Sequence, residues 1–429
     1  MSERVLVVCS DPVAERMNGP AIRAWHMAEV LAGAGCDVRL VSTVAASRRA
    51  EAFEVAAVEE PQGMGRLREW AGVVVTNPGA LRTHPLVGAG HGAVVVDLYD
   101  PFHLENLEAG DEMDAPARAA NVAHLRSVMD DSLRRGDFFL AATERQRDFW
   151  LGSLMSAGRI NPATYDADPT FRRLIDLVPF GISAAPPVKR RPVLRGVVEG
   201  IGADDLVLLW GGGVYNWFDP VTLVEAVDVV RQHVPRVRLV FLGMTNPNPA
   251  IPPMRVAVEV RERAAALGLV GTHVFFNDGW VPYDERADYL LEADVGVSTH
   301  RSHIEASFSF RTRVLDYLWA GLPYVTSAGD SFADLADAEG VGVSVPGGDV
   351  GALGDALVAL LTSPDSLAAC RAAASRVVGR FHWDAVMAPL VAFCLSPRRA
   401  ADSPRSPAGA APSGPRRRRG WRRGGEAAT

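Results

Sequence analysis

The sequence predicts an α/β fold with two domains, each built around a parallel sheet. The chain has 429 residues, enough for two ordinary hydrophobic cores. Its strand-like runs, such as "RVLVVCS" and "LVLLWGG", are apolar throughout, as parallel strands covered on both faces require. These runs alternate with helical patterns twice along the chain, which indicates two successive Rossmann-like domains.

In the first half, the opening strand is followed by a helix over 21–33 and by a long helical insert over 115–135. Further strands are expected at 37–43, 72–77, 93–99 and 138–143. The second half repeats the theme, with helices predicted over 220–232, 255–267 and 283–292. Its strands are expected at 206–212, 237–243, 273–278 and 295–299.

The stretch "SFSFRTRVLDYLWAGLPYV" predicts a helix followed by a strand. Leu315, Leu318 and Trp319 recur at helical spacing, so one face of the helix is expected to be buried. Gly321 supplies a C-cap, and Pro323 ends the helix before the strand "YVTS". Asp316 lies close to the buried face and therefore needs a partner, which is either an arginine of its own helix or a ligand hydroxyl.

The chain divides at the Pro-rich, basic segment "SAAPPVKRRPVLRGVVEG". The predicted parts are an N-terminal domain over 1–182, a linker over 183–200, a C-terminal domain over 201–380, a final helix over 381–396 and a disordered basic tail over 397–429.

Composition and charge exclude several classes of protein. Apolar content of 48% and charge of 22% are typical of a soluble globular protein, and the short first apolar run is too brief for a signal peptide. The four cysteines show no metal-ligand spacing, so we expect buried thiols in a reducing, cytoplasmic setting with no metal site.

The tail carries nine arginines against two acids, a charge of +7, which leaves −14 for the rest of the chain. It is rich in Pro, Gly, Ala and Ser, which favours a solvated extension. Attraction to an anionic surface, such as the inner face of a membrane, stays open as the alternative. The acidic body argues against dedicated nucleic-acid binding.

Candidate binding loops follow several strands. Gly212 and Gly213 come directly after a strand, and Gly279 repeats the pattern after another; without Cβ atoms, glycines let backbone amides approach an anion. Asn18 and Gly19 precede the first helix, although no dinucleotide fingerprint is present. Ligands of open parallel sheets collect where the carboxyl ends of strands meet helix N-termini, so these loops are expected to converge.

The motifs "RTRVLDYLWAGLPYV", "HVFFNDGWVPYDERADYLLEADVGVST" and "LVPFGI" resemble the donor-binding domain of retaining GT-B glycosyltransferases of family 4. The resemblance implies that Asp316 holds the ribose hydroxyls of a nucleotide. It further implies that the sugar diphosphate lies on the N-terminus of that helix, from Ser309 and Phe310 to Thr312, and that Gly279, Trp280 and Val281 cradle the base. Burial of Trp280 in the core is the alternative.

Two departures from the family pattern affect the predicted charges. The first acid of the family's glutamate pair is expected at position 308, where Phe308 stands, and the nearest acid is Glu305. The family's Arg and Lys after the glycine-rich strand are replaced by "VYNWFDP". Arg311 and Arg313 are the expected substitutes, because guanidinium groups suit phosphate oxygens. Pairing of these arginines with Asp316 at helical spacing is the alternative.

In the first domain, "VVVDLYDPFHLE" places Asp100 and His103 after a strand. We expect Asp100, His103 and Glu305 to be the catalytic candidates, with His103 as a base, a sugar contact or a structural residue. Glu144 ends another strand and is expected on the acceptor or phosphate side with Asn18 and Gly19; a salt bridge with Arg147 is the alternative.

The predicted function is transfer of a sugar from a nucleotide diphosphate sugar to a small-molecule or envelope acceptor, with retention implied by the resemblance and with no metal or other cofactor. A helix N-terminus and arginines would stabilise the leaving diphosphate. Two alternatives stay open: a nucleotide-sugar epimerase of the same fold, and a non-catalytic nucleotide-sugar binder.

Overall fold

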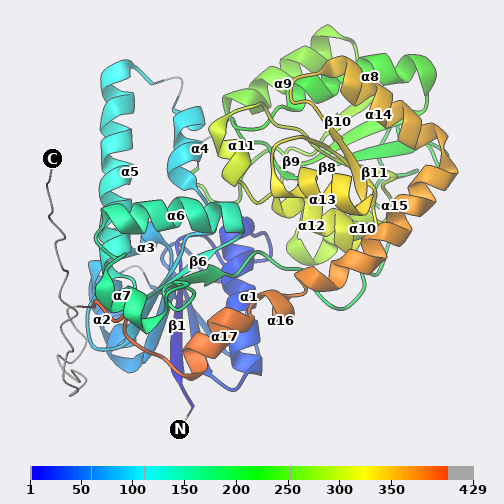
Figure 1. Ribbon diagram of the computed structural model, residues 1–429. Coiled ribbons are helices and arrows are strands. Elements are labelled where there is room, and N and C mark those ends of the chain that lie inside the picture. The colour runs from blue at the N-terminus through cyan, green and yellow to red at the C-terminus, as the bar shows by residue number, and fades with distance from the viewer. Residues whose placement is uncertain (1, 59, 111–112, 252–253, 404–429) are drawn as a thin grey trace, which may run out of the picture.

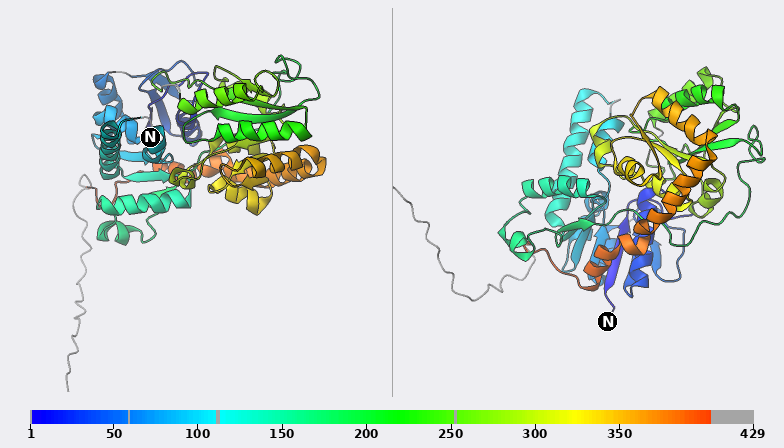
Figure 2. Two further views of the ribbon diagram at one scale, coloured as in Figure 1. Left: turned by 90° about the horizontal axis from the view of Figure 1, so that it is seen from above. Right: turned by 45° about the vertical axis from the view of Figure 1, so that its right-hand side comes forward.

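The computed structural model describes residues 2–58, 60–110, 113–251 and 254–403. Two α/β domains lie side by side, each with helices on both faces of one parallel sheet (Figures 1 and 2). The predicted stretch 404–429 of the basic tail lies outside the described residues.

The first domain holds a seven-stranded sheet in the order β3-β2-β1-β4-β5-β6-β7. Its strands are β1 (Arg4–Cys9), β2 (Asp37–Ser42), β3 (Glu54–Ala57), β4 (Val73–Thr76), β5 (Ala93–Asp97), β6 (Phe138–Ala141) and β7 (Ile175–Leu177). Its helices are α1 (Gly19–Gly33), α2 (Pro61–Trp70), α3 (Pro78–Thr83), the 3-10 turn η1 (Pro85–Gly88), α4 (Phe102–Ala109), α5 (Ala115–Arg135), α6 (Glu144–Ser156) and α7 (Pro162–Ala167). The sequence analysis did not identify several of these elements, among them β3, β7, α2, α3, α6 and α7.

The second domain holds a six-stranded sheet in the order β10-β9-β8-β11-β12-β13. Its strands are β8 (Leu206–Gly213), β9 (Val237–Gly243), β10 (Val274–Phe276), β11 (Val295–Ser298), β12 (Tyr324–Ser327) and β13 (Gly342–Val345). Its helices are α8 (Pro220–His233), α9 (Arg255–Ala266), the turn η2 (Tyr283–Glu285), α10 (Arg286–Leu290), α11 (Ile304–Phe308), α12 (Thr312–Trp319), α13 (Ser331–Glu339), α14 (Val350–Thr362) and α15 (Pro364–Val377).

Both sheets reverse their strand order at one point, between β1 and β4 and between β8 and β11. Ligands of such sheets bind outside the carboxyl ends of the strands at this switch point. The local sequence at both switch points leaves room for a ligand. Asn18 caps α1 by accepting from the Ala21 amide, with Pro20 in the first turn, and the glycine-rich end of β8 keeps side chains away from its switch point.

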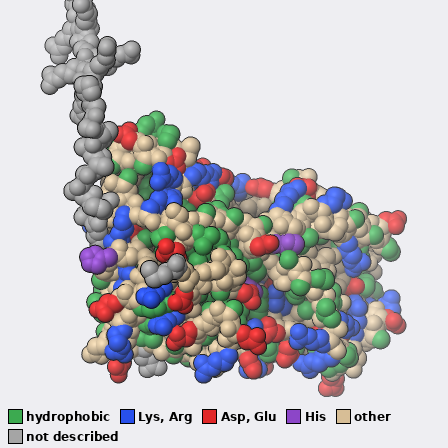
Figure 3. Space-filling view, turned by 90° about the horizontal axis from the view of Figure 1, so that it is seen from below, with side chains coloured by type: hydrophobic (Ala, Val, Ile, Leu, Met, Phe, Trp, Pro, Cys, Tyr) green, Lys and Arg blue, Asp and Glu red, His purple; other side chains and the backbone are tan. Residues whose placement is uncertain are grey.

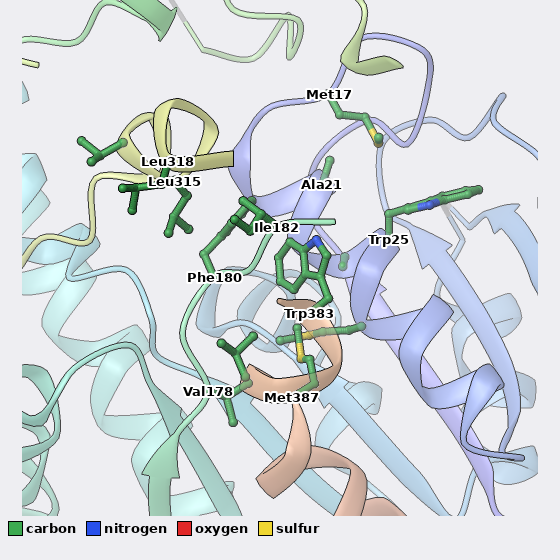
Figure 4. Packing of buried hydrophobic residues seen from close by; sticks show 14 of the residues in the cluster. Met17, Ala21, Trp25, Val178, Phe180, Ile182, Leu315, Leu318, Trp383 and Met387 are labelled. Atoms are coloured by element: carbon green, nitrogen blue, oxygen red, sulfur yellow. The ribbon is translucent and has the colours of Figure 1, made fainter. Parts of the chain in front are cut away.

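The C-terminal segment crosses back to the first domain through the turn η3 (Val378–Phe381), α16 (Trp383–Val386) and α17 (Ala388–Leu395). The last two helices pack against α1. Figure 4 shows the resulting core, in which Trp383 lies beside residues of α1 and of the chain leaving β7. The single helix predicted over 381–396 is two helices, because Pro389 lacks the amide that would continue the first one.

The predicted start of a disordered tail at position 397 is wrong for the residues that follow directly. Arg399 pairs with buried Asp137 at 2.7 Å, and Asp402 pairs with Arg159 at 2.8 Å. Residues 397–403 are therefore part of the first domain.

Within the described ranges, no single helix is long and apolar enough to cross a membrane. One bent pair, Val350–Thr362 with Pro364–Phe381, meets the length and composition criteria only together, at an angle of 94°. On the face drawn in Figure 3, acidic and basic side chains are interspersed over both domains.

Candidate active site between the domains

A cavity of about 310 Å³ lies between the two domains. The first domain contributes the loop after β1 and the start of α4, and the second contributes the ends of β8, β9 and β10 and the N-terminus of α12. We call this space the donor cavity. The predicted residues that line it are Asn18, Gly19, Asp100, Gly212, Gly213, Trp280, Val281, Ser309, Phe310, Arg311, Arg313 and Asp316.

Helix α12 is fixed in the second domain by Tyr317. The Tyr317 hydroxyl accepts from the Gly211 amide at 2.9 Å and lies 2.9 Å from the carbonyl oxygens of Leu209 and Val297, so it ties α12 to both strands of the switch point. Gly296 permits this approach, because a Cβ atom there would lie 2.5 Å from the Tyr317 ring. The helix thus presents its N-terminus and Asp316 to the cavity.

Asp316 pairs with Arg286 of α10, whose Nε donates to Asp316 Oδ1 at 3.0 Å. The alternative of pairing with Arg311 or Arg313 is wrong. Arg286 also stacks on Trp319, with its guanidinium carbon 4.5 Å from the ring centre. The side chain of Asp316 is 34% exposed, so it still offers oxygen to a ligand in the cavity.

Arg313 carries a buried positive charge at the wall of the donor cavity. Its guanidinium lies 4.2 Å from the Trp210 ring and 4.1 Å from the Phe218 ring, and NH2 donates to the Gly213 carbonyl at 2.8 Å. NH1 is buried and has no hydrogen-bond partner in the part of the chain that the structure describes. Burial lowers the pKa of Arg313 to about 10, which leaves the group charged at neutral pH.

The Arg311 guanidinium is held in place by the Glu305 carboxylate. Its NH2 and NH1 donate to the two Glu305 oxygens at 2.8 and 3.2 Å, and the Ser309 hydroxyl donates to the same carboxylate. Glu305 is 1% exposed and does not line the donor cavity, whereas Arg311 does. The structure therefore places Glu305 as a support of Arg311, which differs from its predicted catalytic position. Ser309–Arg311 form the break between α11 and α12.

Asp100 faces the donor cavity from the first domain together with Glu105 of α4, and the two side chains are hydrogen-bonded. Burial raises the pKa of Asp100 to about 6, and the nearby charges of Glu305 and Asp97 act in the same direction. Burial and the Asp100 carboxylate raise the pKa of Glu105 well above its usual value. A carboxylate pair of this kind shares a proton near neutral pH.

Trp280 connects the domains at the rim. Its indole Nε1 donates to the Met17 carbonyl at 3.1 Å, and Arg16 Nε donates to the Trp280 carbonyl at 2.8 Å. Trp280 is half-buried and lines the cavity, so the structure combines the two predicted alternatives for it. Gly279 belongs to the same loop but does not border the cavity.

Two further predicted site residues, His103 and Glu144, do not line the donor cavity. His103 stacks on Phe149 at 5.4 Å, and burial lowers its pKa to about 4, so it is neutral at pH 7 and takes a structural place. Glu144 pairs with Arg172 on the surface and lies 3.9 Å from Arg147, as its alternative interpretation predicts.

Comparison with known proteins identifies the second domain. Residues 205–363 match a family model described as glycosyl transferases group 1. Over these residues the C-terminal domain is similar to the group 1 glycosyltransferases. No match was found among curated proteins.

Solved structures extend the likeness to the whole fold of this glycosyltransferase. HepE from Anabaena, in complex with UDP and glucose, is 13% identical, with 92% of this chain and 99% of that chain covered and a TM-score of 0.65. WaaG, a glycosyltransferase involved in lipopolysaccharide biosynthesis, is 16% identical, with 92% and 100% covered and a TM-score of 0.61. Sucrose-phosphate synthase from Thermosynechococcus elongatus is 15% identical, with 91% and 98% covered and a TM-score of 0.61. The likeness establishes the two-domain GT-B fold.

The family match of the second domain and the GT-B fold together describe a glycosyltransferase. Two residues of its site escaped the sequence analysis. Arg286 was assigned to a plain helix, and only the fold brings it to Asp316, 30 residues later. Glu105 lies five residues after the predicted Asp100, and this short spacing could have suggested that the two carboxyl groups form a pair.

Among the described residues, no group of three or more His, Cys, Asp or Glu side chains is arranged to hold a metal ion.

Proposed function

We propose that the donor diphosphate binds in the donor cavity against Arg313, Arg311 and the N-terminus of α12. The observation that carries the proposal is the buried Arg313, a charged group with an unpartnered N–H at the cavity wall. Leaving such a group unpaired is costly, and an anionic ligand removes the cost. The adjacent Gly212, with φ of 80°, leaves the backbone bare for close approach of phosphate.

In this proposal the nucleoside lies between Asp316 and the Trp280–Val281 loop. Asp316 accepts hydrogen bonds from the ribose hydroxyls, as the resemblance to family 4 implies, and Arg286 holds the carboxylate in position. Trp280 and the backbone of Val281 border the space for the base. UDP is the first ligand to test, because HepE binds it.

The transfer step that we propose takes place beside Asp100. The bond between the anomeric carbon and the diphosphate oxygen breaks, and its electron pair leaves with the diphosphate. The acceptor oxygen bonds to the anomeric carbon, and Asp100 takes the proton of the acceptor hydroxyl. Arg311, Arg313 and the α12 dipole stabilise the charge that develops on the leaving group. Retention of configuration follows from the family resemblance, and NMR of the product tests it.

The decisive experiment compares UDP with uridine in wild type and Arg313→Met. The methionine keeps much of the volume between Trp210 and Phe218 but removes the charge. We expect UDP to bind at least about tenfold more weakly, equivalent to about 1.4 kcal/mol, while uridine affinity stays the same. The fold should be as stable as wild type or more stable, because a buried charge has been replaced by an apolar group. Equal calorimetric UDP affinities would refute the diphosphate assignment.

An epimerase is separated from a transferase by incubation with the donor alone. Conversion of the nucleotide sugar into its epimer without acceptor would indicate the former. The non-catalytic binder would hold the donor tightly and neither hydrolyse nor transfer it. The non-catalytic binder was considered because the family's Arg and Lys after the glycine-rich strand are missing. Arg311 and Arg313 line the cavity and can take the place of these cations, which argues against that alternative.

A further inference from the structure

A second cavity, of about 430 Å³, lies inside the first domain at the carboxyl ends of β1, β4 and β5, beneath α5. It shares Asp11, Pro20, Tyr99 and Asp100 with the donor cavity. A molecule in the second cavity therefore reaches Asp100 from one side while the donor sugar reaches it from the other. The volume lies in the range of pockets that hold small molecules.

The walls of the second cavity are mainly apolar. Several elements supply them: Ala24 and Met27 of α1, Val75 of β4, Phe102 of α4, and Leu125 and Val128 of α5. Binding of an apolar ligand body against these walls is favourable by roughly 25 cal/mol per Å² of apolar surface buried. A highly hydrated polymer would not gain from them.

The inner end of the cavity is acidic. Asp97 is neutralised by Arg23, which donates to both of its oxygens at 2.6 and 2.9 Å. Asp11 accepts from the side-chain amides of Asn18 and Asn248, and no ion pair to Asp11 is present among the residues that the structure describes. Asp100 adds a further carboxyl group.

The basic side chains that line the cavity, Arg82 of α3 and His124 of α5, are both exposed and lie toward solvent. An anionic group at the inner end would lose its water next to carboxylates, because Arg23 is already paired with Asp97 and the basic side chains that line the cavity lie at its rim. That combination is strongly unfavourable.

We propose that the second cavity binds the acceptor, and that the acceptor is a compact molecule with an apolar body, a hydroxyl group and no negative charge on the part that enters. The hydroxyl lies at Asp100, and the apolar body lies between α1 and α5. This inference rests on the proposed function, since Asp100 acts there as the proton acceptor. An acceptor that places a phosphate or carboxylate at the inner end is excluded.

A matched pair of fluorescent probes tests the charge rule. 4-Methylumbelliferyl β-D-glucoside and 4-methylumbelliferyl β-D-glucuronide differ only by a carboxylate in place of a hydroxymethyl group. We expect the neutral glucoside to bind the full chain, saturated with UDP, at least tenfold more tightly than the glucuronide. Equal or tighter binding of the glucuronide, or no binding of the glucoside up to its solubility limit, would overturn the proposal.

A matched pair of variants tests the location. Leu125→Trp fills the cavity from α5, whereas Ala123→Trp adds the same group at an exposed position of α5 that does not line it. Leu125→Trp should weaken glucoside binding at least tenfold and leave UDP affinity unchanged, and Ala123→Trp should change neither. An unchanged glucoside affinity in Leu125→Trp would disprove the site. Failure of the proposed donor site would instead appear as absent UDP binding in wild type.

Discussion

At the scale of single residues, the donor cavity is defined by charges whose partners come from distant parts of the chain. Asp316 is paired with Arg286, and Arg311 is supported by Glu305, whereas Arg313 lines the cavity and its buried NH1 has no hydrogen-bond partner among the described residues. Ligand binding therefore does not need to break the Glu305 pair. The ligand needs only to contact the parts of Arg311 and Arg313 that line the donor cavity.

Replacing Asp316 with alanine should weaken UDP binding at least about tenfold, or about 1.4 kcal/mol. The reason is that the ribose hydroxyls lose an ionised acceptor. Unlike Arg313→Met, this variant should weaken uridine binding to the same degree, because both ligands carry the ribose. Isothermal titration calorimetry measures both. Asp355→Ala, at an exposed position of α14, is the control that should bind like wild type. Unchanged uridine affinity in Asp316→Ala would refute the ribose contact.

The pH profile should report on Asp100. Since burial raises its pKa to about 6, the carboxylate able to accept a proton predominates above that pH. We expect kcat/KM for transfer to fall as the pH is lowered through about 6, approaching tenfold per unit. A profile flat from pH 5 to 8 would remove Asp100 from the proposed role.

The same shift has a consequence for stability. A carboxyl whose pKa is raised by folding stabilises the protein fully at acid pH, and this contribution is lost as the pH rises through about 6. In Asp100→Asn this part of the pH dependence should disappear. Urea unfolding of both proteins at pH 5 and pH 7.5 measures the difference.

At the scale of elements, α12 is the part that positions the site, and its anchor is Tyr317. Tyr317→Phe removes a fully buried hydroxyl and leaves the Gly211 amide without its partner. We expect a loss of about 2 kcal/mol in the free energy of unfolding, the usual cost of an unsatisfied buried group. Urea denaturation measures it. Tyr165→Phe, at a position that is 55% exposed, should change the stability by less than about 0.5 kcal/mol.

The sequence indicates the elements of the sheets better than the contacts between them. Continuous Val and Leu runs predict β1, β8 and β9, because a strand that is buried on both faces needs apolar side chains at nearly every position. The periodicity around Leu315 likewise predicts α12 and places Asp316 close to its buried face. The break at Ser309–Arg311, the pairing of Arg286 with Asp316 and the burial of Glu305 depend on tertiary packing, which a local pattern does not encode.

At the scale of the whole molecule, the chain end is a structural part of the first domain. Truncation after Leu395 removes the partners of Asp137 and Arg159, both nearly buried. We expect it to lower the free energy of unfolding on the order of 3 kcal/mol, the cost of leaving buried charges unpaired. Truncation after Ser403 keeps both pairs and should unfold like the full chain. Chemical denaturation of the two truncated proteins compares them, and equal stability would contradict the structural role of residues 397–403.

The return of α16 and α17 to α1 also limits how this enzyme can be recombined with others. Exchanging everything after the interdomain linker for the same part of another transferase would remove from α1 the helices that cover it. A hybrid should therefore take only the foreign segment equivalent to β8 through α15 and retain the native last helices. Engineers working on donor specificity would splice at two joints, not one.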